Sequence, residues 1–345
     1  MSQLSILADS LIGSEIVKLG NEINERIAKG EKIYNYTIGD FDPKIFPIPQ
    51  ALEEAIIDAY KNHQTNYPPG DGVKDLREAV LDFINDYEGL NYALEEVQIA
   101  SGGRPLIYTV FRTIVDEEDK VVYASPSWNN NHYTHLNWGA HCNVEAQAAN
   151  LFMPTAAELA PHLSGAVLLC LCSPQNPTGT TFSKEELGKI CDLVIQENHK
   201  RADDEKKLYV MYDQMYWMLT YGDTQHYNPV SLRPEMKDYT IFVDGISKVF
   251  AATGVRVGWA LGPAKIIAKM KAFLSHIGAW APLAEQKATA KFLQNREAVN
   301  QYLIPFKEGL HERLQLLYDG FIRLKQKDIL WMLLLHKQHC ILLFP

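Results

Sequence analysis

The chain has 345 residues, of which 47% are hydrophobic and 22% are charged, and its formal net charge is -9. The length predicts either one large domain with a smaller one or two comparable domains. Because an acidic surface does not favour binding to polyanions, nucleic acids and anionic membranes are disfavoured as partners.

The start of the chain and its cysteines indicate a cytoplasmic protein. The N-terminus lacks the basic start and apolar core of a signal peptide, and the longest late apolar run, Ile329 to Leu335, is too short to cross a bilayer. The cysteines form an odd and scattered set, which is typical of reduced thiols: Cys142, Cys170, Cys172, Cys191 and Cys340.

Neither the cysteines nor the histidines predict a metal site. Cys170 and Cys172 lie inside an apolar strand without a second Cys or His cluster, so we interpret them as core residues. His132 and His135 are three residues apart, with no carboxylate or third histidine nearby, which favours loop or surface histidines.

The first third of the chain predicts helices separated by loops. Helical periodicity runs from about residue 14 to residue 29, and an extended, turn-rich stretch follows it. A helix with Pro49 at its start places four apolar residues on one face: Leu52, Ala55, Ile56 and Ala59. After a loop rich in Pro and Gly, another amphipathic helix ends at Gly89.

Strands then alternate with helical segments, which predicts an α/β fold. Short apolar runs rich in β-branched residues indicate strands at 97–101, 120–125, 165–172, 207–213, 240–245 and 255–262. The intervening helices suit crossover connections, one of them with Ser183 as N-cap and Glu186 three residues later. We expect a mostly parallel sheet of about seven strands, sandwiched by helices, that binds ligands at the C-terminal ends of its strands.

The residues just beyond these strands form a chemical set. In chain order they are Gly102, Gly103 and Arg104 at a helix start, Trp128, Asn176, Asp213 followed by Tyr216, Ser247 with Lys248, and Arg256. Each alone has an ordinary explanation, such as a surface lysine, an aspartate N-cap or a core aromatic. Together they offer a helix start that can bind a phosphate, an aromatic ring for stacking, an amide, a carboxylate, a phenol, an amine and a guanidinium. That combination suits pyridoxal phosphate, a cationic ring with an aldehyde and a phosphate.

Several stretches resemble the motifs of the class I/II aminotransferases, the fold-type I family that includes aspartate aminotransferase. They are "SPQNPTG", "YDQMYW", "DGISKVFAATGVRVGWALG", "NYPPGDGVKDLREAV" and "SGGRPLIY". The resemblance extends from about Ile38 to about Lys327. It implies an N-terminal arm with part of a small domain at 1–48 and a large cofactor-binding domain at 49–290. A long helix and an incomplete or aberrant remainder of the small domain would occupy 291–345.

The resemblance also implies a role for each residue of the set. Lys248 would form the aldimine with the cofactor and carry the proton between substrate and cofactor, and Asp213 would pair with the ring nitrogen. Asn176 and Tyr216 would hydrogen-bond the ring oxygen, and Trp128 would stack on the ring. The phosphate would meet the backbone amides of Gly103 and Arg104 and the Arg256 guanidinium, with Tyr67 reaching over from a second subunit. Gly102 and Ser247 would also belong to the cofactor-binding residues. Gly39 and Asn176 would lie near the substrate.

The chain departs from the family pattern at two places. Gly245 stands where the family usually has a serine that helps to bind the phosphate, a role that Ser247 could take only if its hydroxyl turns toward it. No counterpart is found for the arginine that clamps the substrate α-carboxylate, since Arg313 and Arg323 lie earlier, in a helical segment. The Leu-rich tail from about Asp328 also differs from the family, and we hypothesise that it is an out-of-frame segment.

The sequence thus predicts a homodimeric aminotransferase that moves an amino group from an L-amino acid to a 2-oxo acid in two half-reactions. A lyase or decarboxylase on the same scaffold remains open, as does a truncated cofactor-binding protein without transaminase activity. The loop from Ser275 to Pro282 contains no Arg or Lys, which favours a substrate with an uncharged side chain.

Overall fold

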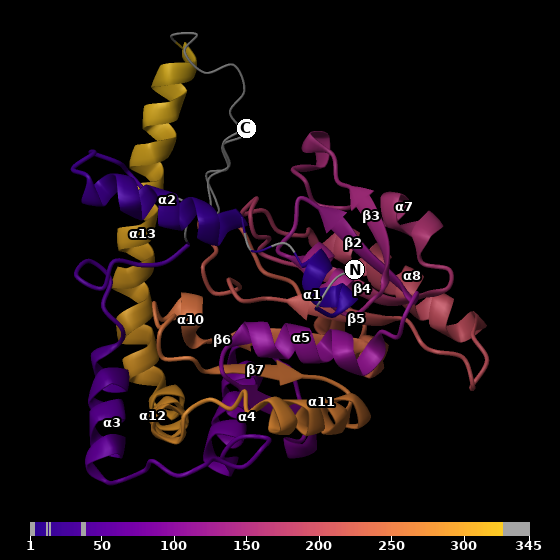
Figure 1. Cartoon of the computed structure of the whole chain (residues 1–345), viewed down its shortest axis with the longest axis horizontal. Coiled ribbons are helices and arrows are strands. Elements are labelled where there is room, and N and C mark those ends of the chain that lie inside the picture. The colour runs from indigo at the N-terminus through magenta and orange to yellow at the C-terminus, as the bar shows by residue number, and fades with distance from the viewer. Residues whose placement is uncertain (1–3, 12, 14, 36–38, 327–345) are drawn as a thin grey trace. The chain divides into compact units, whose positions relative to one another are not determined.

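The computed structural model of the chain describes residues 4–11, 13, 15–35 and 39–326 (Figure 1). The chain divides into two compact units, Met1–Pro47 and Ile48–Pro345. The division at 48 and 290 that the sequence suggested stays a prediction. The Leu-rich tail and Cys340 lie outside the described residues.

The smaller unit contains two helices, α1 (Ile6–Ser10) and α2 (Glu15–Ala28). Ser5 caps α1, because its Oγ accepts a hydrogen bond from the Ala8 N–H at 3.2 Å. The helix expected at about 14–29 is confirmed as α2. Just beyond its end, Glu31 pairs with Arg26 at 2.8 Å.

The larger unit is built on one sheet of seven strands in the order β1-β7-β6-β5-β4-β2-β3. The strands are β1 (Val97–Ala100), β2 (Lys120–Ser125), β3 (Ala140–Glu145), β4 (Ala166–Cys172), β5 (Tyr209–Asp213), β6 (Thr240–Gly245) and β7 (Gly258–Leu261). Neighbouring strands from β3 to β6 are parallel, whereas β7 is antiparallel to both β6 and β1. The predicted sheet is therefore confirmed.

Strand β3 is the one that the apolar pattern did not locate. It lies at the edge of the sheet, and four of its six residues are exposed. A strand with so much exposed surface needs no continuous apolar run, so its sequence "AHCNVE" gives little signal.

The helices of the larger unit connect and cover these strands. They are α3 (Gln50–Lys61), α4 (Lys74–Glu88), α5 (Gly103–Ile114), α6 (Asn130–Leu136), α7 (Ala156–Leu159), α8 (Lys184–Lys200), α9 (Pro229–Leu232), α10 (Ile246–Val249), α11 (Ala264–Ile277), α12 (Leu283–Gln294) and α13 (Arg296–Gln326), with short 3₁₀ helices η1 (Leu94–Glu96), η2 (Ala148–Asn150), η3 (Ala160–His162) and η4 (Pro234–Asp238). Ser183 caps α8 as expected, since its Oγ accepts the Glu186 N–H at 3.1 Å.

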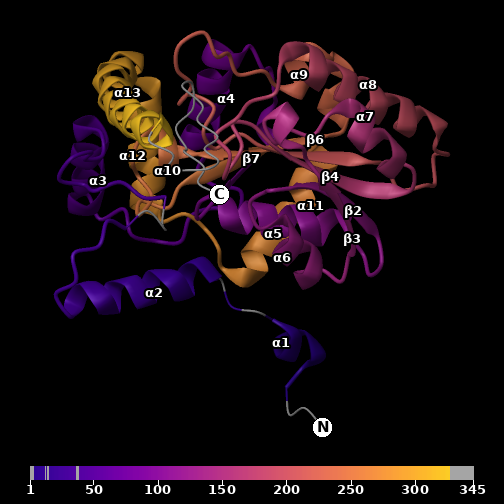
Figure 2. The ribbon, with the colours of Figure 1, turned by 90° about the horizontal axis from the view of Figure 1, so that it is seen from above.

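Two hydrophobic cores lie on opposite faces of the sheet. Alternate residues of β4 divide between them, so that Leu169 and Leu171 belong to one core and Leu168 and Cys170 to the other. Figure 2 shows α5, α6 and α11 on one face and α4, α8 and α9 on the other. Burial on both faces explains why these strands are apolar throughout.

The described cysteines are free thiols, as expected. Cys170 and Cys172 are buried core residues, and burial raises the pKa of the Cys170 thiol far above its usual value. No helix in the described ranges is both long and apolar enough to cross a membrane. Within the same ranges, His, Cys, Asp and Glu form no group of three that could hold a metal ion.

Candidate functional site

The C-terminal ends of the parallel strands bring most of the predicted site residues to one edge of the sheet. The last residue of β4, Cys172, pairs with Asp213 at the end of β5, and Asp213 pairs in turn with Val243 of β6. The loops that carry Asn176 and Tyr216 and the short helix α10 with Lys248 therefore begin side by side. Motifs that follow one another along the chain lie close together in space, because the strands that precede them are parallel.

An anion cradle is formed where α5 begins. Gly102 precedes this helix with φ 81° and ψ -174°, so backbone N–H groups at the helix start remain open to a ligand. A Cβ atom on Gly102 would lie 2.2 Å from Arg256 Nη2, which shows how closely the guanidinium approaches the backbone. Arg256 is held there by hydrogen bonds to Thr253 O at 2.6 Å and Ser101 O at 2.9 Å.

A second guanidinium stands beside this cradle. Burial, together with the nearby charge of Arg104, lowers the pKa of Arg256 from its usual value. Arg104 lies over the ring of Trp128, 5.5 Å from its centroid, and no carboxylate of the described residues pairs with it. Two neighbouring cations repel each other, so this arrangement favours an anion bound near them.

Asp213 presents a buried carboxylate at the end of β5. Its side chain is 8% exposed, and burial raises its pKa to about 6, while a hydrogen bond from the Met215 N–H at 3.1 Å acts in the opposite direction. Within the part of the chain that the structure describes, no cation pairs with this carboxylate, which favours a ligand that brings a positive charge or a proton. A protonated pyridine nitrogen meets that requirement.

Asn176 and Tyr216 extend from adjacent loops toward each other. The Asn176 Nδ2 donates to Tyr216 Oη at 3.4 Å, a long hydrogen bond that brings an amide and a phenol together at this edge. The Asn176 loop closes on itself through Gln175 N–H to Thr180 O at 2.8 Å and Gly179 N–H to Gln175 O at 2.7 Å. The loop therefore has a defined shape before any ligand binds.

Lys248 lies in α10, immediately beyond β6. The preceding Gly245 has no room for a side chain, because its Cβ would lie 2.8 Å from both Gly258 Cα and Val257 O. This packing accounts for the glycine at a position where we expected a serine. Ser247 is buried next to the lysine, at 7% exposure.

Two predicted residues lie outside the loops that follow the strands. Tyr67 is 87% exposed and packs edge-on against Trp280 with ring centroids 5.5 Å apart, beside a groove of about 480 Å³. Gly39 is exposed and belongs to the smaller unit. Their assignments to the cofactor and the substrate stay predictions.

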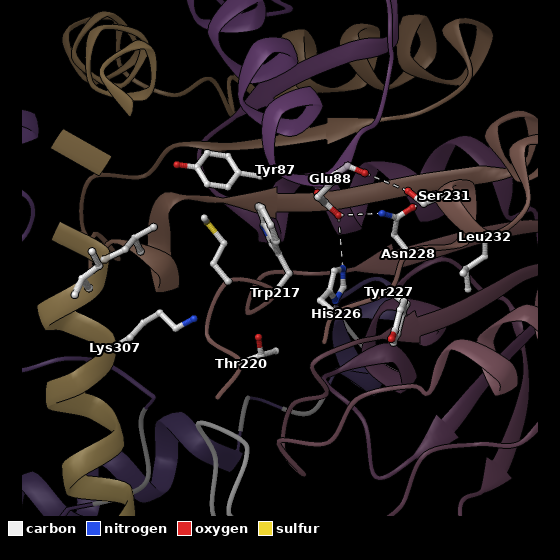
Figure 3. A pocket seen from close by; sticks show the side chains of 13 residues that line it. Tyr87, Glu88, Trp217, Thr220, His226, Tyr227, Asn228, Ser231, Leu232 and Lys307 are labelled. Carbon is white, nitrogen blue, oxygen red and sulfur yellow. Dashed lines mark hydrogen bonds and ion pairs between the residues drawn. The ribbon is translucent and has the colours of Figure 1, made fainter. Parts of the chain in front are cut away.

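Sequence reasoning missed a group of residues behind the site. Glu88, Trp217, His226 and Asn228 line a cavity of about 520 Å³ next to α13, and Figure 3 shows His226 and Asn228 directed at Glu88. Gln214 also donates to Glu88, at 2.7 Å, and Trp217 donates to Asp244 at 2.9 Å. Two signals could have indicated them: Asp244 is a charge inside an apolar strand, and Glu88 is an acid at a helix C-terminus, where the helix dipole disfavours it.

The arrangement fits pyridoxal phosphate at three points. The Gly102 cradle and Arg256 suit a phosphate, buried Asp213 suits a protonated ring nitrogen, and Asn176 with Tyr216 suits a ring oxygen. A lysine on the neighbouring strand end can supply the amine that an aldehyde requires. Fold and site together define a pyridoxal phosphate-dependent α/β enzyme.

Comparison with known proteins agrees with this class. The family model "Aminotransferase class I and II" matches residues 32–339. Aspartate aminotransferase of Geobacillus stearothermophilus is 28% identical over 318 residues, covering 91% of this chain and 77% of the relative. Aspartate/prephenate aminotransferase of Thermus thermophilus is 28% identical over 331 residues, 95% of this chain and 82% of the relative.

A solved structure supports the same conclusion. Aspartate aminotransferase from Thermus thermophilus with maleate superposes with a TM-score of 0.89 at 26% identity, covering 98% of this chain and 84% of the other. The chain therefore belongs to the class I and II aminotransferase family, and it is a pyridoxal phosphate-dependent aminotransferase. The lyase, decarboxylase and inactive-protein alternatives are not favoured.

Proposed function

We propose that the chain catalyses amino-group transfer through Lys248, with the residues of the strand-end edge holding the cofactor. When bound, the cofactor supplies an electron sink for negative charge on the substrate Cα. Lys248 provides the amine that attaches it and moves the proton at Cα. Asp213 keeps the ring nitrogen protonated, and its burial, with a pKa raised to about 6, supports this role.

The remaining residues of the edge orient the cofactor. Arg256 and the backbone N–H groups at Gly103 and Arg104 bind the phosphate, with Gly102 allowing the close approach. Asn176 and Tyr216 donate to the ring oxygen, Trp128 stacks on the ring, and Ser247 lies within the phosphate region. The observation that carries the proposal is the convergence of these groups with Lys248 at adjacent strand ends.

For the amino donor we propose a dicarboxylic amino acid such as aspartate. Arg104 supplies the supporting observation, since its side chain lies on Trp128 without a carboxylate partner among the described residues. Its backbone can serve the phosphate while its guanidinium binds a second carboxylate of the substrate. The names of the relatives, aspartate and aspartate/prephenate aminotransferase, point the same way.

A donor with an uncharged side chain is the second candidate. The segment 275–282 carries no Arg or Lys, and its Trp280 packs on Tyr67. An apolar surface of this kind favours an aromatic or aliphatic side chain over a carboxylate.

We also infer a cytoplasmic homodimer. Tyr67 is a large aromatic that is 87% exposed beside an apolar groove, which suits a residue that reaches into a partner subunit. Sedimentation of the purified protein tests this inference, and a monomer at micromolar concentration would contradict it. The reduced cysteines and the acidic net charge support the cytoplasmic assignment.

Chemical trapping tests the role of Lys248. Borohydride should reduce the cofactor–lysine bond and leave a phosphopyridoxyl label on the peptide that contains Lys248. Lys248→Ala should abolish the label, whereas Lys271→Ala, which removes a surface lysine paired with Asp71 at 2.9 Å, should leave it unchanged. A label on any other lysine would overturn the assignment.

Substrate kinetics separate the two donors. With 2-oxoglutarate as acceptor, we expect Arg104→Gln to lower kcat/KM for aspartate by about 10- to 100-fold, because a hydrogen bond between charged groups contributes about 1.5–3 kcal/mol. The kcat/KM for phenylalanine should change little. Wild-type preference for phenylalanine over aspartate would instead support the second candidate.

A further inference from the structure

The turn formed by residues 213–217 is held by hydrogen bonds on the side away from the proposed cofactor. Within this 213–217 turn, Asp213 Oδ1 accepts the Met215 N–H at 3.1 Å, and Gln214 O accepts the Trp217 N–H at 3.0 Å. These bonds shape the turn itself. A backbone hydrogen bond from the Gln214 N–H to Val243 O, at 3.1 Å, joins the start of the turn to β6, the strand that leads to Lys248.

Two side chains of the turn add further long-range connections. Gln214 is fully buried and donates from Nε2 to Glu88 Oε2 at 2.7 Å, which joins the turn to the end of α4. Trp217 donates from Nε1 to Asp244 Oδ2 at 2.9 Å, which joins the turn to the end of β6. Trp217 is the residue after Tyr216, and Asp244 lies four residues before Lys248.

Trp217 is a buried residue of the larger hydrophobic core, at 7% exposure. Its ring borders the cavity of about 520 Å³, between Tyr87 and His226 (Figure 3). Its ring contacts those two residues at centroid distances of 6.3 Å and 6.1 Å, within the ordinary range for aromatic pairs. Packing keeps the ring in the core, and the directional hydrogen bond to Asp244 fixes the orientation of its indole N–H.

Asp244 is suited to hold a fixed geometry. It is 1% exposed, and its other oxygen, Oδ1, accepts the Gly245 N–H at 2.7 Å. Burial and the nearby Glu88 raise the pKa of Asp244 well above its usual value, so a neutral group at this position is compatible with the site. An asparagine in place of Asp244 keeps one accepting oxygen, whereas its NH₂ group can only donate, so it can satisfy Trp217 or Gly245 but not both.

We propose that Trp217 and Asp244 are a pair of positioning residues that sets the spacing between Tyr216 and Lys248. The proposal rests on the proposed function, in which Tyr216 hydrogen-bonds the cofactor that Lys248 holds. A shift of Tyr216 by a fraction of an ångström would change the acid–base equilibrium of the lysine-bound cofactor and the rate of proton transfer, while substrate binding would change little.

Trp217→Phe tests the pair because it removes the indole N–H and keeps an aromatic ring. The holoenzyme variant should still carry the borohydride label on Lys248. The pH midpoint of the cofactor absorbance should move by at least half a unit, and kcat should fall about 10-fold with KM changed less than 2-fold. Tyr87→Phe is the matched control, since it removes the neighbouring hydrogen bond to Asn300 (2.9 Å) and should leave the midpoint unchanged.

Two Asp244 variants complete the test and cover the case in which Trp217→Phe does not fold. Asp244→Ala should reproduce the shift of Trp217→Phe, and Asp244→Asn, which keeps one accepting oxygen, should shift the midpoint by less. A midpoint that stays at the wild-type value in Trp217→Phe or in Asp244→Ala would overturn the proposal while leaving the proposed function intact. A wild-type protein that takes up no cofactor would overturn the proposed function instead.

Discussion

The guanidinium group of Arg256 lies so close to Gly102 that a Cβ atom on this glycine would stand 2.2 Å from Arg256 Nη2. The backbone of Gly102 adds a second restriction, because φ 81° and ψ -174° form a combination that is open almost only to glycine. Two independent constraints thus require a residue without a side chain where α5 begins. Both arise from the approach of a cation and a helix start to one point, which is the geometry of an anion site.

We predict that Gly102→Ala weakens cofactor binding by about 10-fold or more, since strain of this kind costs about 1–3 kcal/mol and the added Cβ displaces Arg256. Titration of the apo protein with pyridoxal phosphate, followed by absorbance, measures the change. Gly165→Ala is the control, because Gly165 also has a positive φ, 70°, but faces open space. Equal losses of affinity in both variants would contradict a specific role for Gly102.

Arg256→Gln should lower cofactor affinity by about 10- to 100-fold, because it removes one charge-assisted contact to the phosphate. Inorganic phosphate alone should raise the melting temperature of the apo wild type, since a ligand that binds only the folded state stabilises it. The same concentration should have a much smaller effect on apo Arg256→Gln. The control is Arg233→Gln, which removes an ion pair elsewhere, between Arg233 Nε and Asp192 Oδ1 at 2.7 Å. A normal phosphate response in Arg256→Gln would place the anion site elsewhere.

The pKa of Asp213 leads to a prediction about apo-protein stability. A folded-state value of about 6 against the usual 3.8 means that the folded protein holds this proton more tightly than the unfolded chain. Ionisation of this carboxyl therefore lowers the free energy of unfolding as pH rises from about 4 to 6. Above that range the loss reaches about 3 kcal/mol. Asp213→Asn should remove it, so that the apo variant is more stable than the wild type at pH 8 and similar near pH 4.

Urea unfolding of the apo proteins at pH 4.5, 6 and 8 measures this difference. Asp192→Asn should behave in the opposite sense, because the hydrogen bond from Arg233 lowers the pKa of Asp192. That variant should lose a little stability above pH 4 and nothing below it. An Asp213→Asn protein whose stability relative to the wild type does not vary with pH would contradict the assigned pKa.

Activity should respond to Asp213→Asn in the other direction. We expect the loss of a proton-holding carboxylate at the ring nitrogen to lower kcat by about 100-fold or more. The expected combination of a more stable apo protein and a much slower enzyme is typical of a residue kept for function at the expense of stability. Steady-state kinetics with saturating cofactor checks the rate, and an active variant would exclude Asp213 from the reaction.

Single and double substitutions at Asn176 and Tyr216 should lower kcat in steps. Tyr216→Phe removes one hydrogen-bonding group from a pair joined at 3.4 Å, and we expect kcat to fall about 10-fold with cofactor still bound. The double variant Asn176→Ala with Tyr216→Phe should lose less than the product of the single effects, because both groups serve one oxygen. Strictly multiplicative losses would indicate that the two residues act on different atoms.

Much of the fold could be predicted because burial leaves a clear pattern in the sequence. The strands β2 and β6 have the predicted bounds, and β4 and β5 differ by a few residues at their starts. Each is covered on both faces, which requires an apolar run. The edge strand β3 was not predicted, because exposed residues do not have to be apolar. The antiparallel direction of β7 was also not predicted, since the apolar pattern of a strand does not depend on the direction of its neighbour.

The sequence by itself determined the types of group at the site and the order in which they occur along the chain, from Gly102 through Asp213 to Arg256. Local chemistry restricts those positions. Glycine allows an anion to approach a helix start closely, and imine formation requires a primary amine, which lysine supplies. Only the tertiary structure decided which groups meet. The hydrogen bond from Trp217 to Asp244 and that from Gln214 to Glu88 join residues that are 27 and 126 positions apart. Such contacts depend on the pairing of strands and the packing of α4, to which no short stretch of sequence corresponds.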